Sequence, residues 1–338
     1  MSAIEDITSQ APAVEAVPKR AMTLSSGTTF VVVLLLLVVP LFVKNFIIFQ
    51  MTMLLIYGLA VLALNILTGG SGQFSLGNSA FYAIGAYTSA ILMEQYNVNY
   101  ALTLPVAGVI CFGAGFLFGQ PALRLSGVYL ALATFALATA MPQILKLGFF
   151  EEWTGGVQGL VVTKPDAPFG LPMSQDMWLY YFTLAITIAI YVFSVNLLRS
   201  RSGRAFMAIR DNEIAASAMG IDVATYKTLA FGVSAGITGV AGGLGAIAVQ
   251  FVAPDSYTIV LAISLFLGMV VGGVGWLPGS FVGAAFIIFV PNIAEGISKG
   301  LSGAVFGVLL FLVIFLVPHG SRQVAMVAQQ LLGKLRKN

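Results

Sequence analysis

Polar side chains interrupt an apolar run between residues 69 and 85, where the sequence reads GGSGQFSLGNSAFYAIG. Four of them, Gln73, Ser75, Asn78 and Ser79, bring hydrogen-bonding groups to the edge of a membrane-length segment or into it. The glycines before Asn78 weaken a continuous helix, and irregular backbone at membrane depth is tolerated only against protein or a water-filled cavity. The stretch is therefore either a broken or re-entrant segment that lines a pathway, or a tight cytoplasmic turn followed by helix packing through small residues.

The residue types that usually carry catalysis or bind metals are scarce. The only histidine, His319, follows Pro318 at the end of the last apolar run, and the only cysteine, Cys111, lies within another. No Ser-His-Asp set, carboxylate pair or metal-ligand spacing occurs, and the glycine clusters lack the Lys-Ser/Thr pair of a phosphate-binding loop. We therefore expect no catalytic residue, no metal and no cofactor, and the chain is not predicted to be an enzyme.

Ionisable residues in or near the apolar runs lie close to the ends of those runs. They are Glu94, Lys146, Asp255, Glu295 and Lys299. At such positions their side chains reach headgroups or water. The sequence thus offers no clear buried acid of the kind that a proton- or sodium-driven carrier needs.

Composition decides the class of protein that must hold these residues. The chain has 338 residues, of which 59% are hydrophobic and 9% charged, against about 25% charged in soluble domains. Apolar runs near the ~20 residues that cross a bilayer recur along it. They predict an all-α polytopic membrane protein with about ten transmembrane helices, at about 24–43, 51–68, 77–93, 100–119, 127–147, 177–198, 228–250, 258–275, 279–295 and 301–317.

The distribution of positive charge predicts the orientation of these spans. With ten spans, twelve of the 16 Lys and Arg fall on one face and four on the other, and the richer face is the cytoplasmic one. Both termini are then cytoplasmic. The expected organisation is a disordered tail at 1–22, a transmembrane domain at 23–318 with an external loop at about 148–175 and a cytoplasmic loop at about 199–227, and a basic tail at 319–338. The external loop is either a binding surface for a periplasmic or extracellular partner or a connector between spans.

The cytoplasmic loop reads as a folded unit. Ser202 is expected to cap a helix from about Gly203 to Met219, with Gly220 as its left-handed terminator and Asp222 as the cap of the next helix. Apolar and charged residues alternate on the predicted helix, and they include Phe206, Met207, Ile209, Ile214, Arg204, Arg210, Asp211 and Glu213. Such a surface suits the groove of a partner protein. The alternative is an amphipathic helix on anionic headgroups, against which the two acidic residues count.

Several segments resemble the LivM-type permease family of branched-chain amino acid ABC importers. The matching stretches are LNILTGGSGQFSLGNSAFYAIGAYTSAIL from Leu64, PALRLSGVYLALAT from Pro121, WTGGVQGL from Trp153, SGRAFMAIRDNEIAASAMGIDVATYKTLAF from Ser202, MVVGGVGWLPGSFVGAAF from Met269 and VPHG from Val317. They cover nearly the whole chain, from about residue 30 to 322. The family match is specific, whereas the match to a substrate is much less so.

The resemblance implies a type II ABC importer permease bundle with several partners. These are a second, LivH-like permease, two cytoplasmic ATPase subunits, an external solute-binding protein and membrane lipid; nucleic acid is not among them. It places the chain in a bacterial inner membrane and makes the helix around Ala205 to Met219 the coupling helix. Glu213, Ala215, Ala216 and Gly220 resemble a variant of the Glu-Ala-Ala and Gly motif of bacterial import permeases, with Ile214 inserted after the Glu.

The residues expected to couple to the ATPases are Arg204, Phe206, Ile209, Arg210, Asp211, Glu213, Ala216 and Gly220. The residues expected near the translocation path are Gln73, Ser75, Asn78 and Ser79. The predicted function is ATP-driven import of branched-chain or other hydrophobic amino acids. Urea, short amides and aromatic acids are alternative substrates of the same class of importer, and an ion-coupled secondary transporter is the alternative from another class.

Overall fold

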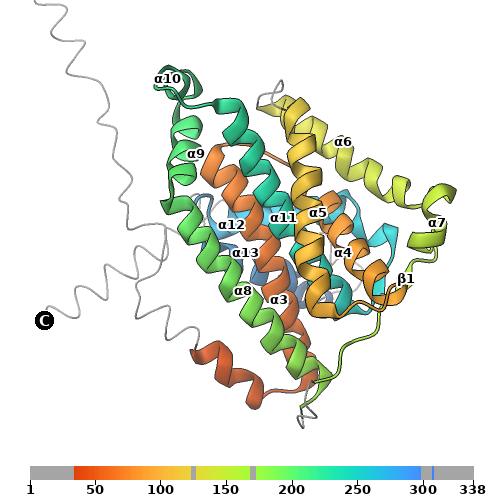
Figure 1. Ribbon diagram of the computed structural model, residues 1–338. Coiled ribbons are helices and arrows are strands. Elements are labelled where there is room, and N and C mark those ends of the chain that lie inside the picture. Colours follow the sequence, from red (N-terminus) through yellow and green to blue (C-terminus); the bar gives the residue numbers. More distant parts are fainter. Residues whose placement is uncertain (1–33, 123–126, 168–172, 298–306, 308–338) are drawn as a thin grey trace, which may run out of the picture.

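The computed structural model describes residues 34–122, 127–167, 173–297 and 307. Within these ranges the chain forms a bundle of helices joined by short loops and one small sheet (Figure 1). In chain order the elements are η1 (Val39–Leu41), α3 (Asn45–Asn65), the π-helical turn η2 (Ile66–Gly70), α4 (Asn78–Glu94), α5 (Tyr100–Ala122), α6 (Val128–Leu145), α7 (Gly148–Thr154), β1 (Leu160–Val161), α8 (Gln175–Arg199), α9 (Arg201–Asp211), α10 (Glu213–Ala218), α11 (Val223–Val249), β2 (Phe251–Val252), η4 (Pro254–Tyr257), α12 (Ile259–Gly272) and α13 (Gly279–Ile297).

The all-α polytopic architecture is confirmed. Five described helices are long and apolar enough to cross a membrane, or six if α6 and α7, which meet at 77°, form one broken span. Eight of the ten expected spans coincide with described helices, namely α3, α4, α5, α6, α8, α11, α12 and α13. The other two, at 24–43 and 301–317, lie largely outside the described residues, so the total of ten stays a prediction.

Helix α11 forms the centre of the bundle, and glycines let its neighbours approach it. Of its most apolar window 78% is buried, compared with 28% for the outer helices α5 and α8. A Cβ atom at Gly85 of α4 would overlap the backbone of Gly239, and one at Gly242 would overlap the carbonyl of Tyr82. The backbones of α4 and α11 therefore touch, as small-residue patterns allow in membrane helices.

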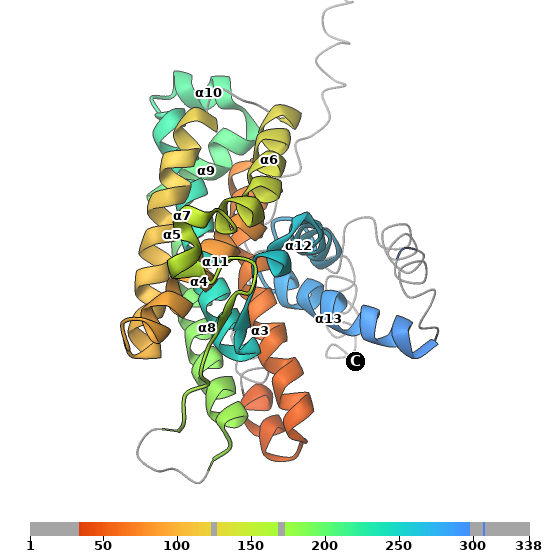
Figure 2. The same cartoon turned by 90° about the vertical axis from the view of Figure 1, so that its right-hand side faces the viewer.

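Helices α12 and α13 lie to one side of the bundle that α4, α5, α8 and α11 form (Figure 2). They pack closely because Gly283 faces the carbonyl of Gly268, and Gly272 faces that of Gly279. The glycines spaced by four in this part of the sequence, at 268 and 272 and at 279 and 283, thus serve helix packing.

The segment between α6 and α8, expected to be an external loop, contains more order than its composition indicated. It holds α7 and the short strand β1, which pairs antiparallel with β2 so that Leu160 faces Val252. The ion pair between Lys146 Nζ and Asp255 Oδ1, 2.6 Å apart, joins the same two regions. This end of α11 is therefore tied to the loop that precedes α8.

Candidate functional site

The polar stretch between α8 and α11 folds as two short helices at one end of the bundle (Figure 1). The Ser200 hydroxyl, not that of Ser202, accepts a hydrogen bond from the backbone N–H of Gly203 and caps α9. The single helix expected from Gly203 to Met219 is broken at Asn212. This residue is extended, with φ −162°, and its side-chain oxygen accepts from the N–H of Ala215 at 3.0 Å to start α10. Asparagine competes for backbone groups in this way and favours caps over helix interiors.

The end of α10 follows the sequence prediction. Gly220 adopts φ +81°, its N–H donates to the Ser217 carbonyl, and the N–H of Ile221 donates to the Ala216 carbonyl at 3.1 Å. These two bonds form a Schellman motif, which glycine at this position favours. Asp222 then caps α11 by accepting from Thr225, whose hydroxyl and N–H hold the pKa of Asp222 below its ordinary value.

The apolar residues of α9 point mainly into the protein itself. Phe206 and Ile209 are fully buried, and the ring of Phe206 meets the ring of Tyr226 edge to face at 6.2 Å. Ala216 of α10 is also buried. These side chains anchor the helix pair to the bundle and leave no apolar surface of their own for a partner.

The outward surface of the helix pair is made by other residues. The side chains of Asp211 and Glu213 are exposed, and Arg204 bonds the carbonyl of Arg199 at 3.1 Å from an exposed position. Ile214 and Met219 of α10 are 84% and 83% exposed. Large apolar side chains so fully open, beside charged ones, are typical of a surface that a partner covers.

Three contacts join this helix pair to the irregular segment after α3. Arg210 Nη1 donates to the carbonyl of Gly69 at 2.8 Å, while its Nε and Nη2 bond Asp211. Gln73 Nε2 donates to the carbonyl of Lys227 at 3.1 Å. The ammonium of Lys227 in turn forms an ion pair with Glu213. Residues expected to couple and residues expected near the path thus share one network.

The segment itself is a buried turn between α3 and α4. It begins in the π-helical turn η2, and the Thr68 hydroxyl donates to the carbonyl of Gln73 at 3.0 Å. The Ser75 hydroxyl accepts from the N–H of Gly77, and Asn78 Nδ2 lies 3.4 Å from Thr238 Oγ1 on α11. The Ser79 hydroxyl is buried without a partner among the described residues. Most of this non-helical stretch is covered by protein, whereas Gly72 and Phe74 are exposed.

Asn65, at the end of α3, fastens the turn between α12 and α13 to the same region. Its amide nitrogen donates to the carbonyls of Gly273 and Trp276, and its oxygen accepts from the N–H of Gly275 at 2.6 Å. Asn65 thus hydrogen-bonds the end of α3 to the turn between α12 and α13. The contribution of Lys227 and of Gly69 carries no signal in the sequence, because each depends on a partner distant along the chain.

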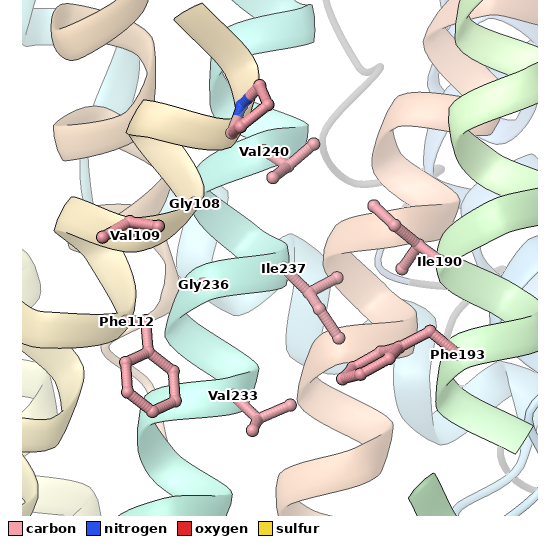
Figure 3. A pocket seen from close by; sticks show the side chains of 10 residues that line it. Gly108, Val109, Phe112, Ile190, Phe193, Val233, Gly236, Ile237 and Val240 are labelled. Carbon is pink, nitrogen blue, oxygen red and sulfur yellow. The ribbon is translucent and has the colours of Figure 1, made fainter. Parts of the chain in front are cut away.

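A cavity elsewhere in the bundle is apolar throughout. It has a volume of about 380 Å³ and lies between α5 and α8 over α11, lined by Pro105, Gly108, Val109, Phe112, Ile190, Phe193, Val233, Gly236, Ile237 and Val240 (Figure 3). None of these side chains can form a hydrogen bond. The cavity offers nothing to a polar solute and suits contact with lipid chains.

Known proteins resemble the chain along most of its length. Residues 46–317 match the family described as branched-chain amino acid transport system, permease component. The chain is 34% identical over 288 residues to the high-affinity branched-chain amino acid transport system permease protein LivM of Escherichia coli strain K12, which covers 76% of this chain and 67% of that protein. The Salmonella typhimurium protein of the same name is 36% identical over 247 residues, or 66% of this chain and 58% of the relative.

A more distant relative has a different stated role. The autoinducer 2 import system permease protein LsrC of Escherichia coli O157:H7 is 28% identical over 262 residues, which cover 75% of this chain and 72% of that protein. No solved structure matches the chain.

Proposed function

The chain belongs to the family of branched-chain amino acid transport system permease components, and we propose that it is the membrane subunit of an importer driven by partner ATPases. The observation that carries the mechanism is the network between Arg210, Gly69, Gln73 and Lys227. It connects a helix pair at one end of the bundle to a buried break between two membrane helices. A displacement of the helix pair α9 and α10 would therefore displace the break between α3 and α4.

In this proposal α10 is the surface that an ATPase subunit grips. Ile214 and Met219 are its exposed apolar contacts, and Asp211 and Glu213 are charged contacts beside them. Phe206 and Ile209 keep α9 rigidly attached to the bundle rather than touching the partner. Arg210 passes movement of α9 to η2, where a π-helical turn is already a weak point in the helix.

We place α9 and α10 in the cytoplasm, together with both termini, because twelve of the 16 Lys and Arg then lie on that side. The segment 148–175 becomes external, and a solute-binding protein would dock there. A second, LivH-like permease and two ATPase subunits complete the importer. The proposed boundaries remain 1–22 for the first tail, 23–318 for the membrane domain and 319–338 for the last tail.

The proposed substrates are branched-chain or other hydrophobic amino acids. The names of the LivM relatives favour them, whereas the LsrC relative is a permease of an autoinducer 2 import system, a different solute. Urea, short amides and aromatic acids are therefore the substrates to compare directly.

Purification from native membranes in mild detergent tests the proposal. The chain should bring down a second permease and two ATPases, and the reconstituted complex should accumulate leucine only with ATP inside the vesicle. If the chain purified alone moves leucine under an ion gradient, it is a secondary transporter and the proposal is wrong.

A further inference from the structure

Four tyrosines that the network above does not use form a continuous cluster inside the bundle, away from α9 and α10. They are Tyr57 of α3, Tyr82 and Tyr87 of α4, and Tyr257 of η4, and we call them the tyrosine cluster. Ring centroids lie 6.3 Å apart for Tyr57 and Tyr82, 5.8 Å for Tyr82 and Tyr257, and 6.2 Å for Tyr87 and Tyr257. Tyr82, Tyr87 and Tyr257 are at most 5% exposed.

The hydroxyl groups of this cluster find no partner within the part of the chain that the structure describes. None of the four makes a hydrogen bond to any residue that the structure describes, and the Tyr87 hydroxyl oxygen is wholly buried. Tyr180 and Tyr181 of α8, by contrast, donate to the carbonyls of Leu36 and Leu37. A buried hydroxyl without a partner is unfavourable, and native interiors almost always satisfy one. The buried Tyr87 hydroxyl, together with three neighbouring tyrosine hydroxyls that bond no described residue, points to a partner molecule from outside the chain.

Packing does not explain the hydroxyl groups either. A Cβ atom at Gly245 would overlap the Tyr82 hydroxyl, so a glycine is needed on α11 to admit that oxygen. Gly243 makes room in the same way for the hydroxyl of Ser89, which is also buried without a partner among the described residues. Phenylalanine and alanine would fill these positions without the polar atoms. The glycines therefore admit polar groups that the fold itself does not use.

The charge around the cluster limits the kind of molecule that it can accept. Helices α3 and α12 contain no Asp, Glu, Lys or Arg, and the only one in α4 is Glu94 at its end. Asp255, two residues from Tyr257, is already paired with Lys146. A solute with net charge would therefore be buried without a counter-charge, which is costly.

We propose that the tyrosine cluster is the intramembrane binding site for the transported solute, a net-neutral small molecule with an apolar side chain. The rings of Tyr57, Tyr82 and Tyr257 contact the apolar side chain, and the hydroxyls bind its polar head. This inference rests on the proposed import function and adds to it the place in the bundle where the solute binds. A zwitterionic amino acid with a branched or aromatic side chain fits, whereas carboxylic acids without an amino group do not.

Cysteine accessibility in the reconstituted importer tests the site. The native Cys111 is buried, so background reaction is low. Tyr87→Cys and Tyr257→Cys should react during turnover with the uncharged reagent methyl methanethiosulfonate, and saturating leucine should slow the reaction at least about threefold, as expected for a site that is mostly occupied. Leu59→Cys, at a fully buried apolar position of α3, is the matched control and should not react.

Removal of single hydroxyls gives a second measurement. Tyr87→Phe should reduce leucine transported per ATP hydrolysed by about tenfold, the factor for one lost hydrogen bond to a polar head. Its melting temperature should be unchanged or higher, because no hydrogen bond within the described chain is lost. Tyr129→Phe, on an exposed residue of α6, should change neither quantity. Tyr257→Phe repeats the test at the other side of the cluster.

The outcomes separate this inference from the proposed function. If the wild type accumulates leucine with ATP but leucine does not slow labelling at either cysteine, or both Phe variants transport normally, the tyrosine cluster is not the site although the importer is. If the wild type does not accumulate leucine, the proposed substrate is wrong. In that case, cysteines that do not react at all reject the cluster as well. Cysteines that react, and that are protected by whichever solute the importer does transport, support the cluster as the site.

Discussion

The guanidinium of Arg210 donates to the carbonyl oxygen of Gly69 across 2.8 Å and so joins α9 to the π-helical turn that ends α3. The two residues are 141 positions apart in the chain. A fixed positive donor is thereby aimed at a backbone acceptor in the weakest turn of a membrane helix. This geometry is suited to transmitting movement from α9 to η2. Because the acceptor is a backbone carbonyl, Gly69 cannot follow Arg210 without displacing the backbone of the turn.

Arg210→Ala should uncouple the importer while the protein remains folded. Phe206 and Ile209 still anchor α9, so assembly and ATP hydrolysis should persist, whereas uptake per ATP should fall about tenfold for the loss of a charge-assisted hydrogen bond of roughly 1.5 kcal/mol. Uptake and hydrolysis are measured together in proteoliposomes. Arg201→Ala, at an exposed position of the same helix that is not among the residues expected to couple, is the matched control, and equal coupling in both variants would contradict the prediction.

The ion pair between Glu213 and Lys227 should respond unequally to the loss of each partner. The Lys227 side chain is 10% exposed and that of Glu213 is 52% exposed. Glu213→Gln leaves a nearly buried ammonium without a counter-charge and should be more destabilising than Lys227→Met by on the order of 1 kcal/mol. Thermal unfolding of the purified complex measures both. Identical melting temperatures for the two variants would show that the pair is solvated and contributes little.

Gly220→Ala should loosen the end of α10. The residue has φ +81° with open space around its Cβ position, so the cost is backbone conformation alone, about 1 kcal/mol. Hydrogen exchange at residues 213–222 should become faster. Gly113→Ala, which also meets open space but lies within α5, should be neutral or stabilising. Unaltered exchange in Gly220→Ala would mean that the Schellman motif does not hold α10.

Gly69→Ala should destabilise the fold directly. Its Cβ atom would lie 2.5 Å from the nitrogen of Gly275 and 2.6 Å from Asn65 Oδ1. The backbone of Gly275 and the hydrogen-bonded amide of Asn65 cannot move aside without breaking contacts. The free energy of unfolding is therefore expected to fall by about 1–3 kcal/mol. The melting temperature should fall for this variant and not for Gly148→Ala, which meets nothing within 4 Å. A normal melting temperature would show that the turn after α12 moves aside easily.

The features that could be predicted from the sequence are those that local chemistry determines. The positions of eight helices follow from the apolar runs, and Gly220 and Asp222 have the conformations that helix ends require. The break at Asn212 escaped prediction because the stretch around it is compatible with one helix. The path of the chain from α9 back to α11 requires a change of direction there, and Asn212 then acts as the N-cap of α10.

Features that depend on distant partners could not be read in advance. Phe206 and Ile209 alternate with charged residues and resemble an exposed surface, yet they are buried because α9 lies against the bundle. The pairing of β1 with β2 and the bond from Arg210 to Gly69 join segments about 90 and 141 residues apart. The tyrosine cluster is similarly indistinct in sequence, since aromatic residues in apolar helices usually serve packing.

The contact of Gly85 with Gly239 limits which parts of the bundle can rearrange. Where backbone meets backbone there is no side chain whose rotamer could change to let one helix slide past the other. Helices α4 and α11 should therefore stay together as one rigid body during each transport cycle. Rearrangement should then involve the elements on the other side of the tyrosine cluster, where Asn65 joins α3 to the turn between α12 and α13 by hydrogen bonds.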